Sequence, residues 1–293
     1  MRWDGDRQSD NVEDRRGDGG GGGGGFGFGG GTIGIGTIVV ALLGSWFFGV
    51  SPTTILNLLS GGGGTQQVQQ HTPAHPPAND RETQFVRTVL GYTEDTWTKI
   101  FREGGANYVP PTLVLYQGRT STGGCGVGQS AVGPFYCPAD RKVYIDLSFF
   151  KLMQERFKVG GEFTQAYVIA HEIGHHVQNL LGISGKVDRA RERSSETEAN
   201  AMSVRLELQA DCFAGVWAYH TNQAKQIIEQ GDIASALNAA SAIGDDALQR
   251  QSRGEVVPDS FTHGSSAQRV RWFKRGLETG SVEQCNTFEA RQL

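Results

Sequence analysis

The stretch Phe163-Thr-Gln-Ala-Tyr-Val-Ile-Ala-His-Glu-Ile-Gly-His-His-Val-Gln-Asn-Leu-Leu181 decides how the chain folds. Its apolar residues recur at helical spacing and Gly182 follows it, which predicts one long helix with an apolar face. This helix contains His171-Glu-Ile-Gly-His175. Side chains four positions apart on a helix are offset by only about 40°, so we expect both imidazoles on one face.

This spacing is typical of two zinc ligands. Imidazole nitrogen is a borderline-soft donor that stays neutral at pH 7, and a helix fixes both rings without loop entropy. Glu172 is displaced by one residue, so its carboxylate should lie beside the metal and take a proton from an activated water. The alternative is that the histidines are ordinary helix residues that bind no metal. His176 falls outside the pair, and we interpret it as a surface histidine or one that supports a ligand.

A third ligand is expected on the next long helix, because a catalytic zinc site typically has three protein ligands. That helix is predicted over 197–224, and it places Glu207 and Asp211 one turn apart among apolar neighbours. A buried carboxylate pair is costly unless it meets a cation or donors. We therefore predict Glu207 as the third ligand and Asp211 as the acceptor of a ligand histidine's outer N–H. The alternatives are two solvated carboxylates, or ligation by Asp188, Glu196 or Glu198, which stand in polar surroundings.

The rest of the chain is uneven in composition. It has 293 residues, of which 42 are glycine. Glycine loses much backbone entropy on folding, so residues 1–31 are predicted to be a glycine-rich tail. Residues 32–50 are predicted to be one transmembrane helix, with a buried helix or a cleaved signal as alternatives. Residues 51–80 are predicted to be a linker, and residues 81–293 one soluble domain.

Charges predict an orientation for the transmembrane helix. Four arginines precede it, whereas the first basic residue after it is Arg81. The N-terminus is therefore predicted to be cytoplasmic, with the protein in the inner membrane, in contact with the lipid bilayer, and its domain in the periplasm or outside the cell. A net charge of -4 and a pI near 6.0 argue against nucleic acid as a partner.

Within the domain, strands are expected before helices. Residues 81–103 have helical spacing that is interrupted at Gly91, which predicts two short helices. Residues 112–116 and 142–146 predict strands, and almost all of the sequence beyond them predicts helices. The expected fold is α+β, mostly helical with a small sheet, and not a doubly wound parallel sheet.

Four cysteines allow three pairings. In an oxidising compartment we expect Cys125 to pair with Cys137, closing a short loop, and Cys212 with Cys285, which would tie down the C-terminal tail. The alternative is four reduced thiols.

The His171-Glu-Ile-Gly-His175 motif with Glu207 and Asp211 resembles the glutamate-zincin pattern of metallopeptidases. More narrowly, nearly the whole chain resembles the bacterial family of predicted neutral zinc metallopeptidases, on Met1-Arg-Trp3, 11–17, the glycine run, the apolar span, 144–146, 259–264 and 268–273. The resemblance implies a zincin-like fold in a membrane-anchored zinc protein. It also implies His171, His175 and Glu207 as ligands and Glu172 as the catalytic residue.

The predicted reaction is hydrolysis of a protein or peptide substrate by an endopeptidase, with Zn²⁺ as cofactor and Glu172 as general base. His263, in the loop 260–264, is a candidate donor to the oxyanion, and an ordinary loop role is its alternative. The strand 142–146 can present its edge to an extended peptide or be purely structural.

Two other functions stay open. The same ligands suit a zinc amidase that acts on a non-peptide substrate, because the metal site does not dictate the substrate. A zinc-stabilised binding or scaffold domain without turnover is the other, although a structural zinc site is typically closed by a fourth ligand and does not need Glu172. The sequence makes no prediction of the oligomeric state.

Overall fold

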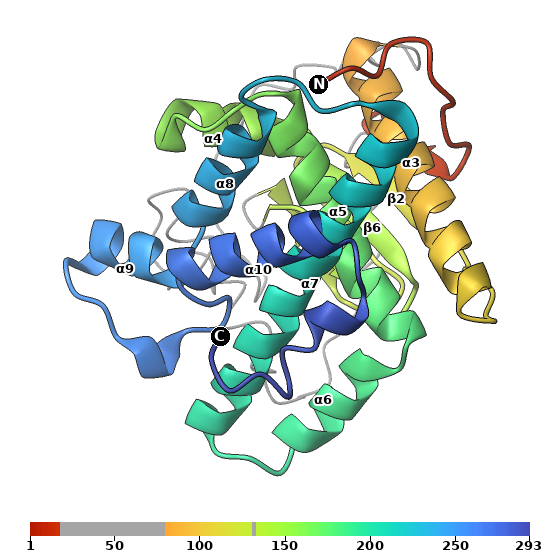
Figure 1. Ribbon diagram of the computed structural model, residues 1–293. Coiled ribbons are helices and arrows are strands. Elements are labelled where there is room, and N and C mark those ends of the chain that lie inside the picture. Colours follow the sequence, from red (N-terminus) through yellow and green to blue (C-terminus); the bar gives the residue numbers. More distant parts are fainter. Residues whose placement is uncertain (18–79, 131–132) are drawn as a thin grey trace.

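The computed structural model describes residues 1–17, 80–130 and 133–293 (Figure 1). The strands are β1 Val12–Asp14, β2 Thr112–Tyr116, β3 Arg119–Ser121, β4 Val127–Gln129, β5 Phe135–Cys137 and β6 Lys142–Asp146. The helices are α3 Arg81–Glu103, α4 Ser148–Phe157, α5 Glu162–Leu180, α6 Ile183–Arg191, α7 Glu196–Lys225, α8 Asp232–Ala242, α9 Asp245–Arg253 and α10 Ser266–Thr279. Two short 3-10 helices are η2 Pro258–Ser260 and η3 Glu283–Cys285. The expected α+β architecture, mostly helical with a small sheet, is present.

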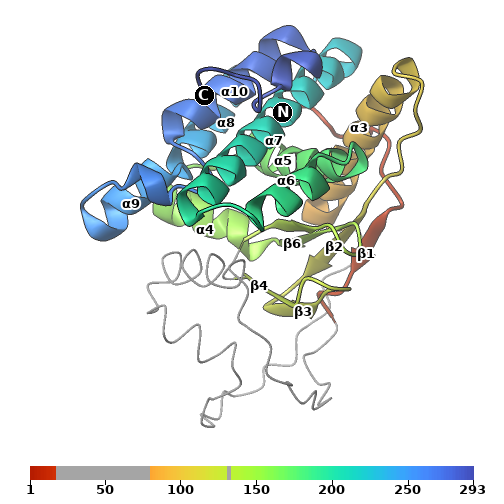
Figure 2. The same cartoon turned by 90° about the horizontal axis from the view of Figure 1, so that it is seen from below.

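The main sheet has the strand order β1-β2-β6-β5. Strands β1, β2 and β6 run parallel, and β5 runs antiparallel to β6. Side chains alternate along β2, so Leu113 and Leu115 enter the large core with the helices, whereas Val114 and Tyr116 pack in a smaller cluster on the other face. Figure 2 shows β3 and β4 on the side of the sheet away from α5 and α7.

The helices stack outward from the sheet, with α5 against α7 and α7 against α10 (Figures 1 and 2). Glycines permit these close crossings. A Cβ at Gly174 of α5 would lie 3.0 Å from the Ala210 carbonyl oxygen of α7, and one at Gly276 of α10 would lie 1.9 Å from the Cys212 carbonyl oxygen. Helix α7 begins with a capping box between Ser195 and Glu198. These crossings hold α5 and α7 in fixed register, which places the side chains between them.

The expectation of two short helices over 81–103 is wrong. Helix α3 is continuous over 23 residues and begins at an N-cap, Asp80, whose side chain accepts from the Thr83 N–H. Gly91 is instead the point where the N-terminal segment crosses the helix. A Cβ at Gly91 would lie 2.9 Å from the Arg7 carbonyl oxygen, and the Arg7 guanidinium donates to the Gly91 carbonyl at 2.8 Å. The glycine therefore serves close contact and does not break the helix.

Residues 1–17 belong to the folded domain. Strand β1 pairs with β2, Trp3 is buried against Phe85, and Arg16 forms ion pairs with Asp14 and Asp80. The sequence predicts a tail over 1–31 on the opposite side of a membrane from the domain. That arrangement is wrong for residues 1–17, because hydrogen-bonded strands lie on the same side.

The transmembrane helix expected at 32–50, and the linker up to residue 79, lie outside the described residues. In the parts of the chain that the structure describes, no helix is both long and apolar enough to cross a bilayer. The fold prediction is corrected in this respect. The predicted inner-membrane localisation, with the lipid bilayer as a partner, is corrected for the same reason and because β1 is part of the domain.

Both expected disulfides are confirmed. Cys125 pairs with Cys137 in the segment between β3 and β6, and Cys212 of α7 pairs with Cys285 of η3. The alternative of four reduced thiols is wrong.

Candidate metal centre

Helix α5 carries buried polar side chains beside its apolar ones. It follows Gly161, whose φ is 109°, and it is succeeded by Gly182, whose φ is 71°, so glycine at both ends turns the chain sharply. His171 and Glu172 are buried, although both are polar. Burial of a histidine is stable only when its nitrogens find partners, and α7 supplies those of His171 through Glu207 and Asp211.

The structure brings His171, His175 and Glu207 together between α5 and α7. The Nε2 atom of His171 lies 3.3 Å from Oε2 of Glu207, and Nε2 of His175 lies 3.4 Å from Oε1. The candidate ligand atoms of the three residues all lie within 4.8 Å of one another. Two imidazole nitrogens and one carboxylate oxygen could hold a metal ion, and this donor set is one that catalytic zinc sites use.

His171 is held by a buried carboxylate on its far side. Its Nδ1 lies 2.9 Å from Oδ1 of Asp211, and a carboxylate only accepts, so Nδ1 donates and Nε2 can present its lone pair to the cluster. The same carboxylate accepts from the Tyr167 hydroxyl at 2.6 Å and from two nitrogens of Arg269 at 2.8 and 2.9 Å. Burial disfavours the charged carboxylate, but Arg269 and His171 outweigh burial and lower the pKa of Asp211 to about 2.

The neutral amide of Gln178 orients His175 in the same way as the Asp211 carboxylate orients His171. The Nδ1 atom of His175 lies 2.9 Å from Oε1 of Gln178, so its Nε2 also faces Glu207. Burial disfavours the imidazolium of His171, but Asp211 outweighs it and raises the pKa of His171 to about 10; Glu207 raises the pKa of His175 in the same way against burial. The cluster therefore attracts positive charge. A divalent cation can replace the protons that the two imidazoles would otherwise bind, so the residues fit a bound zinc.

Glu172 faces a cavity beside the cluster. The cavity has a volume of about 390 Å³, and its lining includes His171, His175 and Glu207. Glu172 is only 8% exposed, and burial raises the pKa of its carboxyl group. Among the described residues no hydrogen bond occupies this carboxylate, which leaves it available to a molecule in the cavity.

His263 reaches the same cavity from the loop before α10. Its Nδ1 lies 3.3 Å from Oδ1 of Asp245, and its backbone N–H donates to the other oxygen of Asp245 at 2.7 Å. Asp245 also accepts from the backbone N–H groups of Thr262 and Gly264. Burial disfavours the charged imidazole, but Asp245 and Glu207 outweigh it and raise the pKa of His263. The loop is therefore fixed around one buried carboxylate.

The sequence matches the family model described as "Putative neutral zinc metallopeptidase" over residues 1–288. The chain belongs to this family. It is 52% identical to "Uncharacterized protein YpfJ" of Escherichia coli (strain K12), over 98% of this chain and 99% of the relative. It is 41% identical to "Uncharacterized protein Rv2575" of Mycobacterium tuberculosis (strain ATCC 25618 / H37Rv), over 71% of this chain and 73% of the relative. No solved structure is significantly similar to the chain.

Membership in the neutral zinc metallopeptidase family and the histidine-glutamate cluster agree on a zinc-dependent hydrolase.

Other expected site residues have different surroundings. His176 is fully buried, so its interpretation as a surface histidine is wrong. Its Nε2 lies 2.7 Å from the Val109 carbonyl oxygen and its Nδ1 3.1 Å from the Tyr136 hydroxyl. Burial lowers the pKa of His176 to about 4.

The strand expected to offer its edge to a substrate does not do so. Strand β6 pairs with β2 on one side and β5 on the other, so it is an interior strand. The described sheet has two edge strands, β1 and β5, and of these β5 reaches the cavity, which Phe135 and Tyr136 line. Of the rival carboxylates, Asp188 lies at the cavity, whereas Glu198 caps α7 and is exposed.

Four residues around the site were not predicted from the sequence: Tyr167, Gln178, Asp245 and Arg269. Arg269 carried a usable signal, because it precedes Val270, Trp272 and Phe273 in a helix with an apolar face, and a buried arginine requires a carboxylate. Tyr167 lies one turn before His171 on the same helix. Asp245 carried no signal, because its role depends on backbone groups in a distant loop.

Proposed function

We propose that the chain is a zinc-dependent endopeptidase in which His171, His175 and Glu207 hold the metal and Glu172 is the general base. One observation carries the proposal. Each ligand histidine uses Nδ1 on an oxygen acceptor and directs Nε2 at the same carboxylate, beside a cavity that Glu172 lines. A closed structural site would not leave a buried carboxylate facing an open space.

Zinc, when bound, polarises the scissile carbonyl and makes water more acidic. The other tasks belong to the chain's own residues. Glu172 takes a proton from the attacking water and passes it to the leaving amine. Asp211 keeps the His171 ring in the tautomer that a metal ligand needs, and Arg269 with Tyr167 keeps Asp211 ionised and in place.

His263 is the proposed donor to the oxyanion that develops on the scissile carbonyl. The Asp245 contact engages its Nδ1, which leaves Nε2 as the second donor position of the ring. The cavity brings this ring and the Glu207 carboxylate into one site, and Glu207 contributes to its raised pKa. A positioned donor of this kind is worth about 10²- to 10³-fold in turnover.

The substrate is proposed to be an extended peptide segment that lies along β5. An edge strand has unpaired backbone groups that can bond a further strand, and β5 leads into the cavity through Phe135 and Tyr136. The cavity also carries apolar side chains, among them Phe149, Val168 and Leu248. These favour a substrate with a bulky apolar side chain next to the scissile bond.

The test is to incubate the zinc-loaded full-length protein with a broad peptide pool and identify new termini by mass spectrometry. The full chain is needed because residues 1–17 are part of the domain. We expect cleavage by the wild-type protein and a loss of about 10²- to 10⁴-fold in Glu172→Gln, which should still bind zinc. Stoichiometric zinc without any cleavage would contradict the peptidase and favour an amidase or a binding domain.

A further inference from the structure

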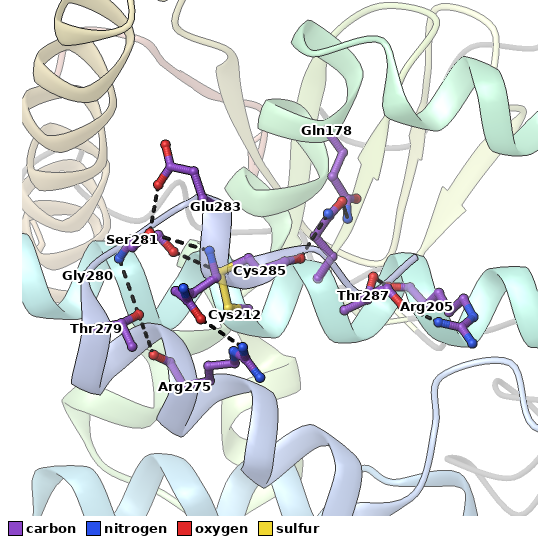
Figure 3. Close-up of a disulfide and its surroundings, with 12 residues drawn as sticks. Gln178, Arg205, Cys212, Arg275, Thr279, Gly280, Ser281, Glu283, Cys285 and Thr287 are labelled. Carbon is purple, nitrogen blue, oxygen red and sulfur yellow. Dashed lines mark hydrogen bonds between the residues drawn. A yellow bond between two sulfur atoms is a disulfide. The ribbon is translucent and has the colours of Figure 1, made fainter. Parts of the chain in front are cut away.

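The C-terminal segment 283–287 is fastened to the helix that carries Glu207. The Cys212–Cys285 disulfide joins it to α7, and both cysteines are fully buried. The Thr287 hydroxyl donates to the Arg205 carbonyl oxygen at 2.6 Å, and the Arg205 guanidinium donates back to the Thr287 carbonyl. Figure 3 shows Gln178 directed toward this segment, with Cys285 and Thr287 lying along α7.

A continuous line of hydrogen bonds joins this segment to His175. The His175 ring donates through Nδ1 to Oε1 of Gln178 at 2.9 Å. The Gln178 amide nitrogen donates to Oε1 of Gln209 at 3.1 Å, and the Gln209 amide nitrogen donates to the Cys285 carbonyl oxygen at 3.0 Å. Gln178 is fully buried and Gln209 nearly so, which means that water does not compete for these bonds.

The orientation of both glutamine amides is determined by the acceptor at the end of this series of hydrogen bonds, the Cys285 carbonyl oxygen. A backbone carbonyl only accepts, so Gln209 must turn its nitrogen toward Cys285 and its oxygen toward Gln178. Gln178 must then turn its nitrogen toward Gln209, and the Leu206 carbonyl, which accepts from the same nitrogen at 2.7 Å, requires the same orientation. Only the Gln178 oxygen is left for His175. The ring therefore carries its hydrogen on Nδ1 and presents Nε2 to Glu207.

We infer that Gln178 and Gln209 are positioning residues for the metal ligand His175, and that the Cys212–Cys285 disulfide makes the C-terminal segment part of the metal centre. The inference rests on the metal site of the proposed function. His171 receives its orientation from Asp211 on α7 itself, whereas His175 receives it through two neutral amides that end at the disulfide-bound segment. The two ligands should consequently differ in their dependence on the segment 283–287.

The test measures the zinc affinity of the full-length protein by competition with a chelator, and the visible spectrum of its cobalt(II) form. Gln178→Leu should weaken zinc binding by about 10- to 100-fold. Gln209→Leu and the double variant Cys212→Ala/Cys285→Ala should weaken it less, with cobalt spectra that shift in the same sense as that of Gln178→Leu. The matched control is Cys125→Ala/Cys137→Ala, which removes the disulfide near β5 and should leave affinity and spectrum unchanged.

Stability is followed separately by urea unfolding of the metal-free proteins, so that a merely structural role can be recognised. If Gln209→Leu and the Cys212–Cys285 variant fold, bind zinc as tightly as wild type and keep its cobalt spectrum, the inference is overturned. If the disulfide variant does not fold, the Gln209→Leu result decides alone. A wild-type protein that binds no zinc would contradict the proposed function first. Lack of peptide cleavage would contradict the peptidase and leave this inference standing.

Discussion

His175 and His176 are neighbours in the sequence, yet they lie on different faces of α5. His175 faces α7, where its Nδ1 bonds Gln178 and its Nε2 points at Glu207. His176 faces the sheet, where the Val109 carbonyl and the Tyr136 hydroxyl occupy both of its nitrogens. The rings of Tyr108 and Tyr136 enclose it edge-on.

His176 differs from His171 and His175 in the number of ring nitrogens that are hydrogen-bonded within the protein. His176 has no lone pair left for a ligand, and burial keeps it neutral, so it acts as a bridge between α5, β5 and the segment before β2. Within the described residues, His171 and His175 each keep one nitrogen whose polar contact is with Glu207 alone. A metal-binding histidine is thus recognised by one bonded and one available nitrogen, and residue type alone does not distinguish it.

Alanine substitutions of the two histidines should have opposite effects on zinc affinity and on stability. His175→Ala should lose zinc by more than the about 10- to 100-fold that removal of a supporting partner costs, because it removes a ligand. His176→Ala should keep wild-type zinc affinity but lower the free energy of unfolding by about 2 kcal/mol or more, since it leaves a cavity at a fully buried position and removes the partner of the Val109 carbonyl. Chelator competition and urea unfolding measure the two quantities.

His176→Gln is the milder control, because an amide can still bond both groups. Weakened zinc binding in a folded His176 variant would show that the two faces of α5 are not independent.

The next effect concerns the carboxylate behind His171. Asp211→Asn should weaken zinc binding by about 10- to 100-fold, because the amide no longer matches its three donors. It should also lower the free energy of unfolding by about 3 to 5 kcal/mol, since the buried Arg269 charge loses its partner. Zinc competition and urea unfolding under chelation separate these two losses.

Asp245→Asn is the matched control for this change. It also removes a buried carboxylate that accepts several hydrogen bonds, but from the His263 loop. Its zinc affinity should stay at the wild-type value. Equal loss of zinc in the two variants would contradict the role assigned to Asp211.

The sequence was sufficient where a role depends on local spacing. His171 and His175 repeat at one helical turn, as do Glu207 and Asp211, and the structure brings these turns together. The sequence was misleading at Gly91, because a glycine that breaks a helix and a glycine that admits another segment look the same. Only the fold distinguishes them.

Long-range pairing explains most of the other failures. Strand β1 is three residues long, with no apolar alternation, and it exists because β2 bonds it from about a hundred positions away. Arg269 meets Tyr167 across 102 positions, and Cys285 meets Gln209 across 76. Local periodicity contains no information about such partners, which is why Arg269, Tyr167 and Gln209 were not predicted, although the residues that cluster as His171, His175 and Glu207 were.

A smaller effect is expected on the face of α5 that carries His176. The Tyr136 hydroxyl bonds His176 and accepts from the Asn179 amide at 2.9 Å. Tyr136→Phe should therefore lower the free energy of unfolding by about 1 kcal/mol, by the same amount with zinc and with chelator, at unchanged zinc affinity. Tyr144→Phe, which removes a hydroxyl bonded only to Asp140 among the described residues, is the control. A zinc-dependent difference confined to Tyr136→Phe would mean that β5 and the metal ligands are coupled through His176, and that the two faces of α5 act as one unit.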